Sequence, residues 1–322
     1  MSNNPDYDKA RALDAFYTND DVSIKCMHVL NSIIPISSFH TIIEPSAGNG
    51  SFLRAYDDIM LTYKNKHDND DTVINNSIVL KAFDIQPSGS DGRIIKKDWF
   101  DVTGFDIGLD SLNEDYYVLI YGNPPFGKRS MLAKKFIMKA EDLNVDMIAF
   151  ILPNIFNKYS NQKAFTDEWM LISSTRLNDY SFNINNEAYH VPSCFQIWVN
   201  KNSGIMNHIN ENNLVDLREN KTVRSNAYIF LHRGDLNADF ALNGNNGITH
   251  DLSTITNSKA EHYIKVNDGY DVTKVRNVFA NLVFNHESSV SGGNYWVSQN
   301  EINKAFNDYC HEHSMYDSDL KI

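Results

Sequence analysis

Short apolar runs alternate with amphipathic stretches through the first part of the chain. Continuous apolar runs, each typical of a buried strand, lie at residues 41–44, 78–84, 116–121, 146–152 and 194–199. Apolar side chains at helical spacing predict helices, which cover residues 22–33, 51–60 and 130–143. Strands that alternate with helices predict an α/β fold with a mostly parallel sheet and helices on both faces. Ligand sites in such a sheet lie at the carboxyl ends of its strands.

The pattern changes after the last of these strands. Turn-forming residues fill positions 200–204, so we divide the chain into domains at residues 1–203 and 204–322. The second part holds short aromatic strand-like pieces, such as 227–232, and a predicted final helix at 299–309. We therefore expect a smaller α+β domain that follows the α/β domain.

Composition and charge narrow the class of protein. The chain has 322 residues, of which 42% are hydrophobic and 22% charged, as in globular proteins. A formal net charge of −12 argues against a protein that coats nucleic acid through bulk positive charge. The three cysteines are scattered, without a C-x-x-C pair, and the first residues form no apolar leader. We expect a cytoplasmic or other reducing intracellular compartment, no secretion and no membrane partner.

A glycine loop follows the first strand. Glu44 ends that strand, and the loop reads Pro45, Ser46, Ala47, Gly48, Asn49 and Gly50. Two glycines separated by one residue allow a sharp turn and close approach to a ligand, while the next helix offers unpaired N–H groups. No Gly-Lys-Ser/Thr follows and a third glycine is missing, so phosphate binding is the weaker interpretation. Asp84 ends the next strand, where a carboxylate accepts hydrogen bonds from ribose hydroxyls or caps a turn.

A rigid polar loop follows the third strand. It reads Asn123, Pro124, Pro125 and Phe126. Two prolines fix φ twice and keep Asn123 out of the helical region. The Asn123 side-chain carbonyl and a backbone carbonyl can both accept from one exocyclic NH₂ group, and Phe126 can stack on the ring that carries it. The loop therefore suits a planar amide or amine substrate.

These two loops together carry a resemblance. The stretch 44–53 followed by 123–126 resembles motifs I and IV of the S-adenosylmethionine-dependent N6-adenine methyltransferases, in their gamma order. Phe16, Tyr17 and Thr18, before the helix at 22–33, resemble motif X of that family. The resemblance covers residues 11–200 and fades beyond them. It implies a Rossmann-like class I methyltransferase sheet that binds the cofactor, and leaves residues 204–322 as a smaller recognition domain.

The resemblance also implies roles for single residues toward S-adenosyl-L-methionine. The residues implied to contact this cofactor are Tyr17, Thr18, Glu44, Ala47, Gly48, Asn49, Gly50, Asp84, Asp98 and Trp99. Tyr17, Thr18, Glu44 and the loop would hold its methionine end, and Asp84 its ribose. Asp98 would meet its adenine amine, with Trp99 or Phe100 beside the adenine ring.

Target binding is implied in the same way. Asn123 and the Pro124 carbonyl would hold the N6 amine, Pro125 would stiffen the loop and Phe126 would stack. Phe182 matches the position of a second aromatic that packs on an extruded base, and a core position is equally compatible with this residue. No metal, histidine or cysteine is needed, because fixing two acceptors favours the pyramidal, nucleophilic form of the amine.

A basic run follows the target motif. Its cations are Lys128, Arg129, Lys134 and Lys135. They either contact phosphates of a nucleic acid or form a solvated helix face. Residues 205–322 carry 10 Lys and Arg against 15 Asp and Glu, so that part is no general DNA clamp. His311 and His313 lack the spacing of a helical zinc pair, and residues 243–247 are typical of a turn.

The sequence therefore predicts methyl transfer to adenine N6 in a nucleic acid, with DNA favoured. RNA, including cap-proximal adenine, is the first alternative. Glutamine methylation of a protein is a second, disfavoured by Phe126 where that family carries tyrosine. An inactive methyltransferase-like subunit, possible with or without a protein partner, is a third, disfavoured by the intact Gly48 and Gly50.

Overall fold

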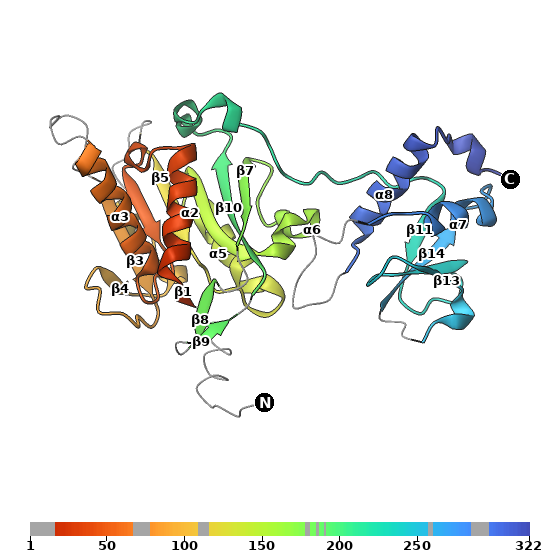
Figure 1. Cartoon of the computed structure of the whole chain (residues 1–322), viewed down its shortest axis with the longest axis horizontal. Helices are drawn as coiled ribbons and strands as arrows, with labels where there is room; N and C mark the ends of the chain where they lie inside the picture. Colours follow the sequence, from red (N-terminus) through yellow and green to blue (C-terminus); the bar gives the residue numbers. More distant parts are fainter. Residues whose placement is uncertain are drawn as a thin grey trace. The chain divides into compact units, whose positions relative to one another are not determined.

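A computed structural model gives the fold as two compact units, the first ending at Arg218 and the second beginning at Glu219 (Figure 1). The residues that the structure describes are 17–66, 78–108, 116–177, 181–184, 187–189, 191–256, 260–284 and 296–322. Phe16 of the predicted motif X and part of the polar segment after the second predicted helix lie outside the described residues.

The first unit is built on a seven-stranded sheet in the order β4-β3-β2-β5-β6-β10-β7. The strands are β2 (Thr41–Glu44), β3 (Val79–Asp84), β4 (Ile94–Lys96), β5 (Val118–Gly122), β6 (Met147–Pro153), β7 (Trp169–Arg176) and β10 (Ser193–Asn200). Strands β4, β3, β2, β5 and β6 pair in parallel, whereas β10 pairs antiparallel with both β6 and β7. The predicted α/β fold class is confirmed, and strands β4 and β7 are additions to the prediction.

Helices bury both faces of this sheet. On one face, α2 (Asp20–Ile33) and α3 (Ser51–Lys66) pack in a core that includes Ile42. On the other, α5 (Met131–Asp142) packs in a core that includes Ile43. Successive residues of β2 thus enter opposite cores, and this explains why the strands read as continuous apolar runs. Two short helices, α4 (Gly104–Ile107) and α6 (Tyr159–Gln162), complete this unit.

The unit boundary lies 15 residues beyond the predicted one, at Arg218 in place of residue 203. Ile205 and Ile209 are buried in the core of the first unit. The Leu217 N–H donates to the Leu171 carbonyl at 2.7 Å, and the Arg218 guanidinium donates to the Trp169 carbonyl at 3.0 Å. The turn at 200–204 therefore lies inside the first unit, because apolar residues that follow it are buried in the core of that unit.

The second unit contains a four-stranded antiparallel sheet in the order β11-β14-β12-β13. These strands are β11 (Tyr228–Leu231), β12 (Phe240–Asn243), β13 (Thr249–His250) and β14 (Glu261–Val266). Helices α7 (Val272–Ala280) and α8 (Gln299–Glu312) share its core, with α8 at the position of the predicted final helix. In the described parts of the chain, none of the helices has the length and apolarity needed to cross a membrane.

Candidate functional site

The predicted glycine loop runs from the carboxyl end of β2 to the first residue of α3. Gly48 and Gly50 have φ values of +52° and +80°, in the left-handed region that favours glycine. A Cβ at Gly48 would lie 3.1 Å from the Tyr17 ring, so this ring packs directly against the loop. Tyr17 belongs to β1 (Tyr17–Thr18), which pairs with β8 (Phe182–Ile184). The structure thus brings the predicted motif X and the glycine loop together.

Asp84 ends β3 beside the loop and braces it. One carboxylate oxygen accepts from the Gly48 N–H at 2.7 Å, and the other accepts from the Gln86 N–H at 2.7 Å. The turn-capping interpretation of Asp84 is therefore realised. Because an ionised carboxylate offers about four acceptor sites, these two bonds leave capacity for ribose hydroxyls.

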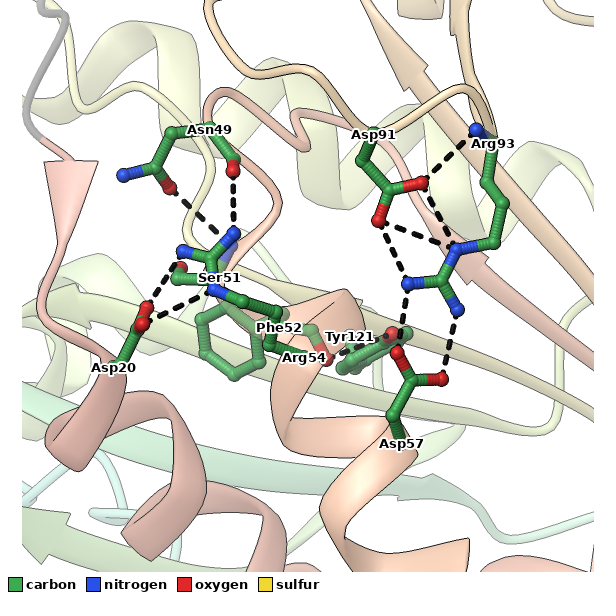
Figure 2. A network of polar contacts seen from close by, with 9 residues as sticks. All are labelled: Asp20, Asn49, Ser51, Phe52, Arg54, Asp57, Asp91, Arg93 and Tyr121. Atoms are coloured by element: carbon green, nitrogen blue, oxygen red, sulfur yellow. Dashed lines mark hydrogen bonds and ion pairs between the residues drawn. The ribbon is translucent and has the colours of Figure 1, made fainter.

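Two arginines fix the glycine loop and the segment after β3 (Figure 2). Arg54 of α3 donates to the Asn49 carbonyl at 2.7 Å and forms a bidentate pair with Asp20 at 3.0 and 2.6 Å. Arg93 forms a bidentate pair with Asp57 of α3, at 2.8 Å for each bond, and also contacts Asp91 at 2.7 Å. These pairs tie α2, the loop and the segment after β3 to the start of α3.

The segment after β3 also touches the loop backbone directly. The Ser88 N–H donates to the Gly48 carbonyl at 3.1 Å, and a Cβ at Gly89 would lie 2.8 Å from the Asn49 carbonyl oxygen. The Asp91 carboxylate lies 3.7 Å from the Cβ position of Gly50, and its hydrogen bonds to Arg93 lower its pKa. Sequence reasoning missed Arg54, Asp91 and Arg93. No local pattern predicts the pairing of Arg54 with Asp20 or of Arg93 with Asp57, which are 34 and 36 residues apart.

Glu44 is the buried carboxyl group of the site. Its side chain is 1% exposed, and Oε2 has no hydrogen-bond partner among the described residues. Burial, and then the negative charge of Asp84, raise the pKa of Glu44 to about 8. On the neighbouring strand, a Cβ at Gly122 would lie 3.2 Å from the Glu44 Cγ. An orphaned buried oxygen at this edge is a place for a ligand that brings a donor or a positive charge.

The target motif follows β5 at the same edge of the sheet. The Asn123 carbonyl accepts from the Ser46 hydroxyl at 3.0 Å, which joins this motif to the glycine loop. The Phe126 carbonyl accepts from the Leu132 N–H at 3.2 Å and so holds the start of α5. Gly127 has φ +69°, and a Cβ there would lie 2.6 Å from the Leu132 Cβ, so only glycine fits. The tetrapeptide is thus fixed at both ends, with Asn123 half-buried.

The two predicted stacking aromatics lie in contact with each other. The Phe126 and Phe182 ring centroids are 6.2 Å apart at an interplanar angle of 89°. Phe126 is 8% exposed and Phe182 is fully buried, and both belong to the core that α2 covers. Phe182 thus lies in the core and makes an edge contact with Phe126.

Asp98 and its two aromatic neighbours follow β4. The Asp98 carboxylate accepts from the Phe100 N–H at 3.0 Å and caps a short 3₁₀ turn. Trp99 is 1% exposed and stacks on Phe136 in the core, and its place beside a cofactor ring stays a prediction. Phe100 is 39% exposed, and it is the aromatic of this pair that a ligand can reach.

Comparison with known proteins points to methyltransferases. Residues 55–204 match the family model described as the EDM2 methyltransferase-like domain, from within α3 to just past β10. A search of curated proteins found no match.

Solved structures with similar folds include three of interest. One, described as a modification subunit of a type I restriction enzyme from Vibrio vulnificus YJ016, is 12% identical at a TM-score of 0.41 over 58% of this chain and 44% of that one. The EcoKI M protein is 16% identical at a TM-score of 0.40, and the match covers 57% of this chain and 44% of that one. A third structure, from Listeria monocytogenes, is described as a class I S-adenosylmethionine-dependent methyltransferase. It is 11% identical at a TM-score of 0.39, and the match covers 57% of this chain and 60% of that one. The chain thus spans about half the length of these proteins.

The residues of the site fit S-adenosyl-L-methionine, the cofactor expected of a methyltransferase-like domain on this fold. Glu44, Asp84 and Asp98 lie at or just after the carboxyl ends of β2, β3 and β4, which are neighbours in the sheet. The orphaned Glu44 oxygen suits a cationic amine, and Asp84 suits vicinal hydroxyls. The family match and the mixed α/β sheet therefore support a methyltransferase that uses this cofactor.

Proposed function

We propose that this protein transfers a methyl group from S-adenosylmethionine to the exocyclic N6 of adenine in a nucleic acid, with DNA as the favoured polymer. One observation carries the proposal: the Asn123 to Phe126 tetrapeptide follows β5 at the cofactor edge and is bonded to the glycine loop through Ser46 and Asn123. The hydrogen bond between this polar acceptor loop and the glycine loop supports a site in which the amine and the methyl donor meet.

The chain's own residues act by positioning. The bound cofactor supplies an electrophilic methyl group on its sulfonium. Adenine N6 is a poor nucleophile because its lone pair is delocalised into the ring. Acceptance of its two N–H groups by the Asn123 side chain and the Pro124 carbonyl favours the pyramidal form, in which the lone pair is localised. Two prolines keep these acceptors fixed, so little reorganisation is needed when charge develops.

Phe126 supplies the stacking face in this proposal. Extrusion of a base from a duplex costs a few kcal/mol, and one aromatic stack returns about 1–3 kcal/mol. Because Phe126 is 8% exposed, an incoming adenine has to displace part of its edge contact with Phe182. Single-stranded targets avoid the extrusion cost, and this keeps RNA as the alternative polymer.

The test is transfer of labelled methyl groups from S-adenosylmethionine to double-stranded DNA, single-stranded DNA, RNA and protein extracts. We expect N6-methyladenine in one nucleic acid, lost in Asn123→Ala and kept in Asn212→Ala, a matched change at an exposed asparagine. Labelled glutamine in a protein would contradict the proposal and show that the substrate is a side-chain amide. Cofactor binding without any transfer to these four substrates would contradict the proposed reaction.

A further inference from the structure

A basic surface begins immediately after the target tetrapeptide and continues along α5. Residues 128–140 hold five cations and no acidic residue. Lys128, Arg129 and Lys135 are exposed, while Lys134 and Lys139 are partly buried. We call these five side chains the α5 cationic face. The net charge of the whole chain is −12, so this positively charged segment differs in sign from the protein as a whole.

The cations of this face form no ion pair with the described residues, and the nearest acidic residues in the sequence are Glu141 and Asp142 at the end of α5. Elsewhere in the unit, Arg54, Arg93 and Lys97 each meet a carboxylate at 2.6–2.8 Å. Clustered like charges repel one another, so the face is stabilised when an anion from outside approaches it.

The shape of the face suits an extended anion. Met131, Lys135 and Met138 follow one another at helical spacing on the outer side of α5, and the two methionines are 61% and 56% exposed. From residue 131 to residue 139 the helix rises about 12 Å at 1.5 Å per residue. A nucleic-acid strand carries one phosphate charge per ~3.4 Å of its axis, so several phosphates span that length.

A strained backbone turn at Arg129 and Ser130 connects the tetrapeptide to this face. Arg129 and Ser130 have φ values of 56° and 59°, which are strained for residues that carry a side chain. The Ser130 N–H donates to the Gly127 carbonyl at 3.1 Å, and the Ser130 side chain is buried. The strained turn thus leaves Arg129 exposed within three residues of Phe126. Strain of this kind persists where surrounding structure enforces it, and it is concentrated at functional sites.

We propose that the α5 cationic face holds the sugar-phosphate backbone of a nucleic acid next to the nucleotide that enters the Asn123 loop. The ligand chemistry is a run of phosphodiesters, so DNA and RNA share it. Lysine and arginine contacts to phosphates fix position and carry no sequence information, so this face sets where the strand runs and leaves target choice to other residues. The inference rests on the proposed function for its orientation, but binding at this face is measurable without any methyl transfer.

The experiment measures binding of fluorescent double-stranded DNA, single-stranded DNA and single-stranded RNA to the full chain, without cofactor, over a series of salt concentrations. The test variant is Lys135→Ala with Lys139→Ala. The matched control is Lys25→Ala with Lys96→Ala, two exposed lysines of the same unit outside this face. A third variant, Lys135→Arg with Lys139→Arg, keeps the charge. Unchanged thermal unfolding confirms that each variant is folded.

We expect the test variant to bind about tenfold more weakly and to lower the slope of log affinity against log salt by about 1.8 for duplex DNA, or about 1.4 for a single strand. The control and the arginine variant should match the unchanged protein. The polymer that shows the slope change is the ligand. An unchanged slope, an equal loss in the control, or no binding of any polymer at low salt would overturn the inference. Lost methyl transfer with an intact slope effect would instead count against the proposed reaction alone.

Discussion

On the proposed cofactor side of the candidate site, arginines pair with carboxylates of the first unit, whereas on the proposed target side a run of cations pairs with none of the described carboxylates. Arg54 and Arg93 each form bidentate pairs that hold the glycine loop and its neighbour. Across the sheet edge, Lys128 and Arg129 are exposed without a described ion-pair partner. The proposed cofactor side is therefore organised by internal contacts, whereas the cations of the proposed target side form no ion pair with a described residue.

The backbones of the two sides differ in the same sense. On the cofactor side the left-handed positions are glycines, Gly48 and Gly50, which adopt them without strain. On the target side Arg129 and Ser130 adopt them as well, at a cost of about 1–3 kcal/mol each. Internal pairing and unstrained turns give a preformed glycine loop, whereas the turn after Phe126 stores strain that the surrounding contacts sustain.

The largest effect should come from Asn123, the proposed side-chain acceptor for the substrate amine. Asn123→Ala removes one of two acceptors for the amine, and loss of such a preorganised group costs about 10²–10³ in turnover. Because Asn123 contacts the glycine loop through its backbone carbonyl, which the substitution keeps, cofactor affinity should change little. Single-turnover methyl transfer and calorimetric cofactor titration check the two halves of this expectation. Equal loss in both would make Asn123 a structural residue of the cofactor site.

The tight turn behind the tetrapeptide gives the next prediction. Gly127→Ala puts a Cβ 2.6 Å from the Leu132 Cβ at a φ of +69°, so we expect the free energy of unfolding to fall by ~3 kcal/mol or more. Gly108 has φ +78° with no atom of a described residue within 4 Å of its Cβ position, so Gly108→Ala should cost only ~1–2 kcal/mol. Denaturant unfolding of both variants separates the clash from the conformational penalty. Equal costs would mean that the loop moves freely away from α5.

Glu44 gives the pH dependence. Its folded pKa of about 8 lies above the ordinary 4.5, so the folded protein binds an extra proton between these values. Stability from this group is complete below pH 4.5 and is lost as pH rises toward 8, by up to ~1.4 kcal/mol per pH unit. Glu44→Gln has no such proton, so unfolding curves of the two proteins should converge at low pH and diverge in favour of Gln at high pH. Parallel curves would place Glu44 in a more polar setting.

The cofactor should reverse that penalty. A bound ammonium group favours the ionised carboxylate, so cofactor affinity should rise by up to about tenfold per pH unit as the pH approaches 8 in the unchanged protein. Glu44→Gln should bind more weakly and lack most of this slope. Proton release on binding, obtained by calorimetry in buffers of different ionisation enthalpy, measures the same event directly. Release of equal size in Glu44→Gln would assign the proton to another group.

The sequence predicted the parts of the molecule that local pattern encodes. Apolar runs predicted the strands that carry Glu44, Asp84 and the residue before Asn123, and the signal is clearest for β2 and β5, which are buried on both faces. The pattern could not separate Trp99 from Phe100, since neighbouring aromatics at a turn differ only in which one meets the core. The first compact unit continues to Arg218, past the predicted division at 203, because a turn in the sequence does not show whether the core ends there.

Contacts between segments far apart in the chain, such as that of Arg54 with Asp20, could not be predicted from the sequence. A substitution at Arg54 should give the smallest of the predicted effects. Arg54→Lys breaks the bidentate pair with Asp20 and the bond to the Asn49 carbonyl, while Arg93→Lys changes contacts that do not reach that carbonyl. Because the Arg54 side chain is 44% exposed, the pair itself is worth at most ~1 kcal/mol. We expect cofactor affinity to fall about threefold to fivefold in Arg54→Lys and less in Arg93→Lys, with turnover at saturating cofactor unchanged. A fall in turnover instead of affinity would show that the glycine loop orients the methyl group as well as binding the cofactor.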